Sequence, residues 1–223
     1  AVLTARDAGV CVPAIIGVGQ GGEGDVLLVS AGPLGEPFDH PDDAMLRAAW
    51  RELRDLHTKA RITHGGLQQE SIRVLPETVE LLGLSKASLF PTDQQIASDV
   101  TSMLAVQAIA AGSTRSVTAA VDVVEREVLE STLPFVQEAA LEPELRKQLK
   151  AAGVEAETLR RDLAEQLGAE APELAAVKRV KVSQIFVALG AVIAANALIS
   201  QVTDVGFDTL VDEVQNASLA WLV

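Results

Sequence analysis

The chain of 223 residues contains one cysteine, no tyrosine and only 3% aromatic residues. A single thiol cannot form an intramolecular disulfide or a cysteine-based metal site, and the apolar neighbours of Cys11 predict a buried structural residue. Basic residues are also scarce, so the formal net charge is −13. Nucleic acid binding needs a clustered basic surface, which makes nucleic acid a poor candidate partner.

A signal peptide is also missing, because the first residues have neither its basic region nor its apolar region. The chain begins at Ala1 and not at a methionine, so we expect it to be an internal piece of a longer protein. His40 and His57 are far apart in sequence and have polar neighbours, which gives little support for a histidine metal site. The sequence predicts no metal and no cofactor.

A glycine-rich stretch over 17–22 matches the dinucleotide-binding pattern Gly-x-Gly-x-x-Gly. That pattern binds a pyrophosphate only where a helix follows the glycines. The residues over 25–30 are instead the apolar run Asp-Val-Leu-Leu-Val-Ser, which is typical of a strand. The glycines are therefore predicted to form the turn of a hairpin.

Apolar spacing and turn residues predict an α+β fold in which helices dominate the second half. The expected elements are a helix closed by Gly9, strands over 12–18 and 25–30, a proline-punctuated loop over 33–41, a helix over 43–59, strands over 73–75 and 79–82, and helices over 93–111, 115–130, 133–140, 144–152 and 156–167. The alanine, valine and leucine that supply most of the apolar content suit this helix-rich packing.

Two short stretches carry the main functional signal. They are His64-Gly65-Gly66-Leu67-Gln68-Gln69-Glu70-Ser71 and Leu81-Leu82-Gly83-Leu84-Ser85, separated by the predicted pair of short strands. They resemble the catalytic loop (His-Gly-Asp-Leu-x-x-x-Asn) and the metal-binding loop (Asp-Phe-Gly) of aminoglycoside phosphotransferases and related kinase-like proteins. The resemblance implies a kinase-like domain over residues 1–141, which consists of the end of the small lobe followed by the large C-terminal lobe.

The resemblance also shows what has been lost. Gly66 stands in place of the catalytic base, Ser71 in place of the metal-binding Asn, and Gly83 in place of the metal-binding Asp. Phosphoryl transfer depends on a group that orients the nucleophile and on metal ions that neutralise the phosphates, and glycine supplies neither. We therefore expect no catalytic residue in the degenerate catalytic loop (His64, Gly66, Ser71) or in the degenerate metal loop (Gly83, Leu84, Ser85).

The same resemblance implies a role for three other residues. His64 would be a buried imidazole that braces the loop. Asp99 would anchor the backbone of the catalytic loop from the next helix, although a solvated helix residue is an equally good interpretation. Glu70 lies four residues after Gly66 and is a candidate to replace a lost carboxylate.

Residues 182–202 carry no formal charge and are numerous enough to cross a bilayer core as a helix. Lys178, Arg179 and Lys181 precede this run and acidic residues follow it, which predicts a transmembrane helix over 179–203 with the preceding residues in the cytoplasm. A buried core helix of a soluble bundle is the alternative. Asn196 and several small residues predict contact with other transmembrane helices.

The rest of the C-terminal part is interpreted around this span. Residues 142–178 would be a helical juxtamembrane linker, and residues 204–223 an interfacial helix followed by the start of a second span, with Trp221 at the membrane interface.

The whole arrangement is similar to actinobacterial membrane proteins in which a kinase-like domain precedes a lysylphosphatidylglycerol-synthase-type transmembrane region. It implies a catalytically inactive cytoplasmic module in the cell membrane that scaffolds or regulates lipid handling or transport in the cell envelope. The implied partners are membrane lipid and other transmembrane helices or protein subunits. One alternative is an active small-molecule phosphotransferase with displaced carboxylates such as Glu70 or Glu80. Another is a wholly soluble helical interaction protein.

Overall fold

The computed structural model describes residues 1–22, 26–32, 35–170 and 172–175, all of which belong to the first of two compact units, Ala1–Val177 and Lys178–Val223. The predicted transmembrane helix over 179–203, the basic residues before it and the predicted interfacial helix over 204–223 lie outside the described residues. Within the described part of the chain, no helix is both long enough and apolar enough to span a membrane.

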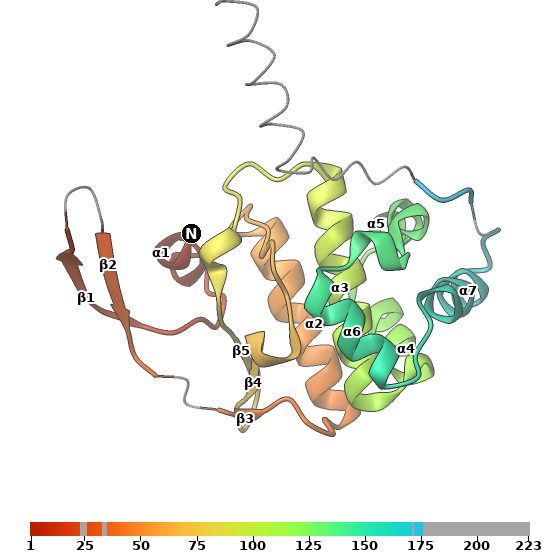
Figure 1. The fold of residues 1–223 in the computed structure, drawn as a ribbon, viewed down its shortest axis with the longest axis horizontal. Coiled ribbons are helices and arrows are strands. Elements are labelled where there is room, and N and C mark those ends of the chain that lie inside the picture. Colours follow the sequence, from red (N-terminus) through yellow and green to blue (C-terminus); the bar gives the residue numbers. More distant parts are fainter. Residues whose placement is uncertain (23–25, 33–34, 171, 176–223) are drawn as a thin grey trace, which may run out of the picture. The chain divides into compact units, whose positions relative to one another are not determined.

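The first unit combines helices with two small antiparallel sheets, so the α+β prediction is confirmed (Figure 1). Its elements are α1 (Val2–Asp7), β1 (Ile15–Gln20), β2 (Val26–Ser30), β3 (Glu36–Pro37), α2 (Asp43–Thr58), the 3₁₀ turn η1 (Gln69–Ser71), β4 (Ile72–Val74), β5 (Val79–Leu81), the 3₁₀ turn η2 (Leu84–Lys86), α3 (Asp93–Ala111), α4 (Ser113–Val123), α5 (Arg126–Thr132), the 3₁₀ turns η3 (Leu133–Phe135) and η4 (Glu138–Ala140), α6 (Pro143–Ala151) and α7 (Ala156–Leu167). One sheet pairs β1 with β2, and the other has the order β3-β4-β5.

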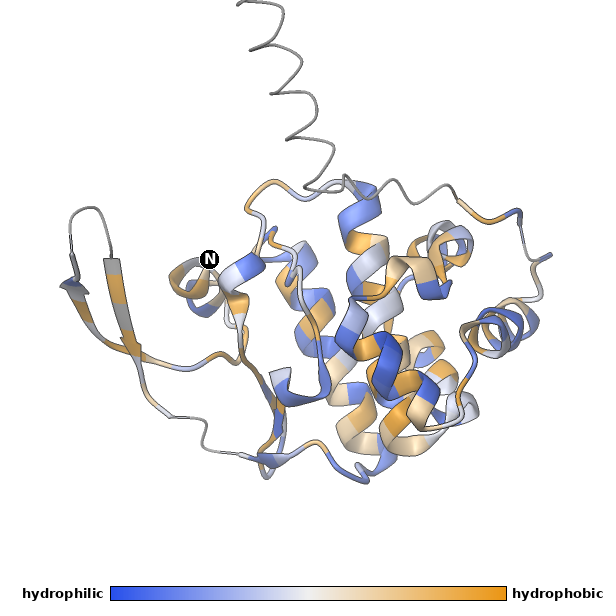
Figure 2. Ribbon diagram, viewed as in Figure 1, coloured by the Kyte–Doolittle hydropathy of each residue, from blue (hydrophilic) through white to orange (hydrophobic). Residues whose placement is uncertain are grey.

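Strands β1 and β2 form an antiparallel hairpin, as the sequence predicts, but Gly17 and Gly19 lie within β1, opposite Val29 and Leu27, and not in the turn. The strands differ from the predicted ones at their first residues, because β1 begins at Ile15 and not at Val12. Residues before β1 are held elsewhere: Leu81 of β5 donates its backbone N–H to the Cys11 carbonyl at 2.8 Å. Both strands of the hairpin contain hydrophobic residues (Figure 2). Some of their side chains are exposed to solvent, among them Ile16 at 68% and Val18 at 66% exposure.

Cys11 is half-buried and not fully buried as predicted. Its backbone N–H donates to the Glu52 carboxylate at 2.8 Å, and the Thr78 hydroxyl donates to the same carboxylate at 3.0 Å. Burial raises the pKa of the thiol, and the nearby charges of Glu52 and Glu80 raise it further. Only the thiolate is a good nucleophile, so these contacts make Cys11 a weakly reactive thiol.

Helices α2 and α3 pass through the core of the first unit. Helix α2 is capped by Asp42, whose side chain accepts the Met45 backbone N–H at 2.8 Å. Helix α3 is preceded by Thr92, which forms a capping box with Gln95. The two helices are joined by Gln107, which accepts the indole N–H of Trp50 at 3.0 Å and donates to the Leu46 carbonyl at 2.9 Å. This buried amide is thus hydrogen-bonded at both ends, as interior polar groups require.

Two of the predicted helices differ from the observed ones. The predicted helix over 115–130 is two helices, because Val124 and Glu125 have extended backbone angles between α4 and α5. Val123 and Val124 form a β-branched pair, which weakens a helix at this point. The predicted helix over 133–140 is the pair of 3₁₀ turns η3 and η4. Pro134 lacks a donor N–H there, and Gln137 is extended between the two turns.

Helices α6 and α7 pack into the same core as the rest of the first unit. Their leucines Leu145, Leu149, Leu159 and Leu163 are buried in a single hydrophobic cluster with α2, α3 and α4. The first compact unit consequently extends to Val177, and most of the segment predicted as a linker over 142–178 belongs to it. The boundary between the compact units follows Val177, next to the predicted end of the linker at residue 178. Burial of these leucines joins the segment to the core.

Candidate functional site

The two loops singled out in the sequence lie against each other. The backbone N–H of Leu82 donates to the Ser71 carbonyl at 2.8 Å. A Cβ atom built on Gly83 would lie 3.9 Å from the Ser71 hydroxyl oxygen. Thr63, just before the first loop, pairs with Ser88, just after the second. Ser71 and Gly83, the two residues predicted to replace metal ligands, are therefore neighbours in space.

Asp99 of α3 is hydrogen-bonded to the backbone of the first loop. Its carboxylate accepts the backbone N–H of His64 at 2.6 Å and that of Gly65 at 2.9 Å. The carboxylate is also 3.0 Å from Nε2 of His57, which comes from α2. Asp99 is only 2% exposed, so the interpretation of it as a solvated helix residue is wrong. Its contacts are those that the kinase-like resemblance implies for an anchor of this loop.

His64 is a buried connection between the two loops. Its Nε2 lies 2.7 Å from the Leu82 carbonyl, which can only accept, so Nε2 carries the proton. Burial lowers the pKa of His64, although the charge of Asp99 and the hydrogen bond to Leu82 oppose this effect. The imidazole is thus neutral near pH 7, and its Nδ1 has no hydrogen-bond partner among the described residues.

The lowered pKa of His64 predicts a loss of stability in mild acid. Above pH of about 6.5 both folded and unfolded chains hold a neutral histidine, whereas below it the unfolded chain binds a proton that folded His64 resists. The free energy of unfolding should therefore fall as the pH drops through this window, by up to about 1.4 kcal/mol per pH unit. Urea unfolding at pH 7.5 and 5.5 measures the fall.

The variant that isolates this effect is His64→Gln, whose amide can still donate to the Leu82 carbonyl but does not titrate. Its stability should depend less on pH than that of the unmodified chain. The exposed His40 provides the control, since His40→Gln should leave the pH dependence unchanged. Equal pH dependence in all three proteins would contradict the assignment to His64.

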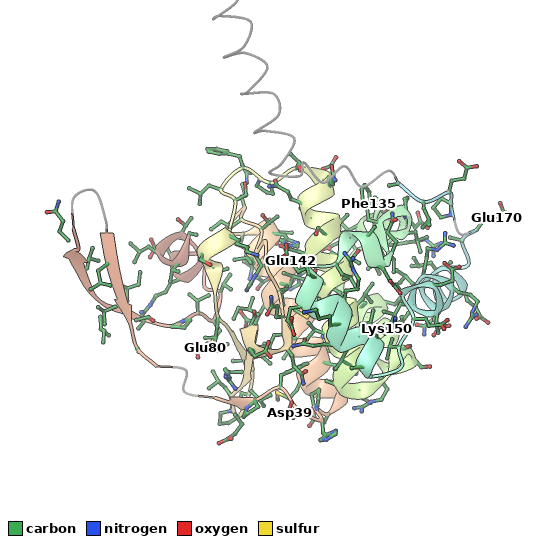
Figure 3. The ribbon with its side chains drawn as sticks, in the orientation of Figure 1. Asp39, Glu80, Phe135, Glu142, Lys150 and Glu170 are labelled. Atoms are coloured by element: carbon green, nitrogen blue, oxygen red, sulfur yellow. The ribbon has the colours of Figure 1, made fainter. Side chains whose placement is uncertain are left out.

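The space next to Gly66 is covered by Lys86. A Cβ atom on Gly66 would lie 3.1 Å from Cδ of the Lys86 side chain, and one on Gly65 would lie 2.2 Å from the Lys86 carbonyl oxygen. The ammonium group of Lys86 pairs with Glu142 at 3.3 Å. Figure 3 shows Glu142 at the start of α6. A lysine side chain thus lies where the resemblance places the space for a catalytic carboxylate.

A cavity of about 250 Å³ opens beside Gly83. Its described lining consists of Val2, Val12, Pro13, Ile15, Ser30, Leu81, Gly83, Leu84 and Ser85, none of which carries a charge. The carboxylate of the exposed Glu70 accepts an N–H from Gln148 of α6 at 3.4 Å, and buried Glu80 lies close enough to Cys11 to raise the pKa of its thiol. Neither glutamate is among the residues that line the cavity.

The sequence-based interpretation missed His57 as part of this site. Its polar neighbours in the sequence gave little support for a metal site, and no other role was predicted for it, but its side chain is only 8% exposed. The signal was its helical spacing: His57 lies four residues after Leu53 and seven after Trp50, both on the buried face of α2. Within the described ranges, no group of histidine, cysteine or acidic side chains is arranged to hold a metal ion.

No protein-family model matches the chain. A search of curated proteins finds no relative either. The fold and the site define an α+β protein in which two loops are hydrogen-bonded to each other.

Proposed function

We propose that the chain is a catalytically inactive, kinase-like module of an integral membrane protein, and that it acts as a cytoplasmic scaffold or regulator of lipid handling or transport in the cell envelope. The observation that carries the proposal is that the two loops contact each other, while the positions expected for a catalytic base and for metal ligands have no such groups. Asp99 accepts backbone N–H groups of the first loop, and His64 contacts the Leu82 carbonyl of the second loop. In the resemblance, Gly66, Ser71 and Gly83 stand where base and metal ligands would be.

The chemistry of phosphoryl transfer explains why this combination favours a scaffold. The transferred group needs metal ions against its phosphate oxygens and a carboxylate to orient the nucleophile. An uncharged cavity beside Gly83 and a lysine side chain over Gly66 provide neither of them. Because Asp99 is buried and hydrogen-bonded to the first loop, we infer that the conformation of the loops, and not catalysis, is what the protein uses.

The full chain is expected to transfer or hydrolyse no γ-phosphate above background when it is incubated with ATP and Mg²⁺. Labelled phosphate release over hours measures this activity. The matched variant Glu70→Gln should behave identically, since this glutamate contacts Gln148 of α6. Turnover by the unmodified chain that disappears in Glu70→Gln would contradict the proposal and favour an active phosphotransferase with a displaced carboxylate.

A gain-of-function variant tests the frame itself. Gly83 has a left-handed backbone (φ 79°), which Asp tolerates better than most residues, and only the Ser71 hydroxyl lies near its missing Cβ. The double variant Ser71→Asn, Gly83→Asp should acquire Mg²⁺-dependent stabilisation by ATP, measured as a thermal shift. The single variant Ser71→Asn, which adds no carboxylate, should show none. A double variant without this response would argue against the kinase-like alignment.

The alternative of an active small-molecule phosphotransferase has less support. It requires carboxylates that converge on the cavity beside Gly83, and the described lining of that cavity has none.

The membrane part of the proposal rests on the uncharged run over 182–202 and the basic residues before it. Extraction of membranes with alkaline carbonate distinguishes an integral protein from a soluble one. The full chain should stay with the membrane pellet. Release into the supernatant would favour the soluble interaction protein, in which residues 182–202 form a core helix.

A further inference from the structure

A second cavity, of about 110 Å³, lies among α2, α3 and the start of α5, away from the cavity beside Gly83. Its described lining is Trp50, Leu53, Arg54, His57, Thr58, Ile96, Val100, Val124, Glu125 and Val128. Helix α3 contacts both α2 and α5 in the first unit (Figure 1). We propose that this cavity binds a small, uncharged apolar molecule, and that its occupancy is transmitted through His57 and Asp99 to the His64–Gly65 loop.

The size and lining of the cavity determine the class of ligand. Six of its residues are aliphatic or aromatic, namely Trp50, Leu53, Ile96, Val100, Val124 and Val128. An apolar cavity of about 150 Å³ binds a benzene-sized molecule. The cavity described here is smaller, about 110 Å³, but it opens to the surface, so it suits one ring or a branched alkyl group that is only partly enclosed. Burial of that apolar group would drive binding.

The charges around the cavity argue for an uncharged ligand. The guanidinium of Arg54 is paired with Asp55 at 3.1 Å, and it also donates to the Val123 carbonyl at 3.5 Å. His57 is paired with Asp99. The remaining charged side chain of the lining, Glu125, is exposed and repels anions. A carboxylate-bearing analogue should thus bind more weakly than a neutral one of the same size.

The connection to the loop consists of three hydrogen-bonded contacts, all made by the Asp99 carboxylate. His57 lines the cavity and lies 3.0 Å from the Asp99 carboxylate. The same carboxylate oxygen accepts the His64 N–H at 2.6 Å, and the second oxygen accepts the Gly65 N–H at 2.9 Å. A ligand that shifts the imidazole of His57 would therefore shift the carboxylate that holds the loop.

Nuclear magnetic resonance on the full chain tests the binding site, with cyclohexanol as the probe. The chain has two tryptophans, so the indole N–H signal of Trp50 is assigned by comparison with Trp221→Phe. Cyclohexanol should shift the Trp50 signal saturably, with a dissociation constant of about 1 mM. Cyclohexanecarboxylate should bind at least about tenfold more weakly. Val128→Phe, which fills the cavity, should weaken cyclohexanol at least tenfold, while Val128→Ala should still bind. A linear response, or an equal response in Val128→Phe, would overturn the site.

The amide signal of Gly65 tests the connection. Cyclohexanol should shift it in the unmodified chain and in His57→Gln, whose amide can still donate to Asp99. In His57→Leu, the Trp50 signal should still respond while the Gly65 signal does not. A Gly65 response that persists in His57→Leu, or is absent from the unmodified chain, would overturn the relay and leave only the cavity. This test does not depend on whether the chain is a pseudokinase.

Discussion

Replacement of Asp99 with alanine should lower the free energy of unfolding by about 3–5 kcal/mol. The buried carboxylate accepts the His64 and Gly65 backbone N–H groups and contacts His57, and all three donors lose their partner in the variant. Hydrogen bonds to a charged group contribute about 1.5–3 kcal/mol each, and contributions within one network do not add fully. Urea unfolding of the full chain at pH 7.5 measures the loss.

The control for this prediction is a carboxylate of the same type at the surface. Asp122 of α4 is exposed and lies 3.6 Å from Arg47, so Asp122→Ala should cost less than about 1 kcal/mol. The variant Asp99→Asn keeps one accepting oxygen but turns an amide donor towards the loop, and it should fall between Asp122→Ala and Asp99→Ala. An Asp99→Ala variant as stable as Asp122→Ala would show that the loop is held mainly by other contacts.

Helix bounds were predicted best where capping residues in the sequence mark an end of the helix. The bounds of α3 and α7 agree with the prediction because the first starts with a capping box and the second ends at Gly168 in a left-handed conformation. The break between α4 and α5 and the turns over 133–140 were missed because their local signals, the Val123–Val124 pair and Pro134, only weaken a helix and do not by themselves fix where it ends. The two-residue strand β3 was missed because it exists only through its pairing with β4.

The candidate site was predictable only in part, for the same reason. Each of the two loops is contiguous in the sequence, so the resemblance could single both out as a candidate site. The position of Lys86 over Gly66 depends on η2 lying against the first loop, which is a tertiary contact. The contact of His57 with Asp99 likewise joins residues 42 positions apart. Sequence therefore located the loops, whereas the network that holds them required coordinates.

Gly65→Ala should be the second strongly destabilising change, with a loss of about 2–5 kcal/mol. The backbone of Gly65 is left-handed (φ 74°), which costs a residue with a Cβ atom about 1–2 kcal/mol. The added Cβ would also lie only 2.2 Å from the Lys86 carbonyl oxygen. Because the obstacle is backbone, the two loops would have to separate, and overpacking of this kind costs about 1–3 kcal/mol more.

Gly83→Ala is the matched control, because it separates the clash from the backbone conformation. Gly83 is also left-handed (φ 79°), but its added Cβ would meet only the Ser71 hydroxyl at 3.9 Å. This variant should lose only the conformational cost of about 1–2 kcal/mol. Urea unfolding of both variants gives the difference, which measures how rigidly the first loop is packed against Lys86. Equal losses of stability in the two variants would mean that the first loop moves away from Lys86 at little cost. Loops that separate so easily would not support a role that depends on their conformation.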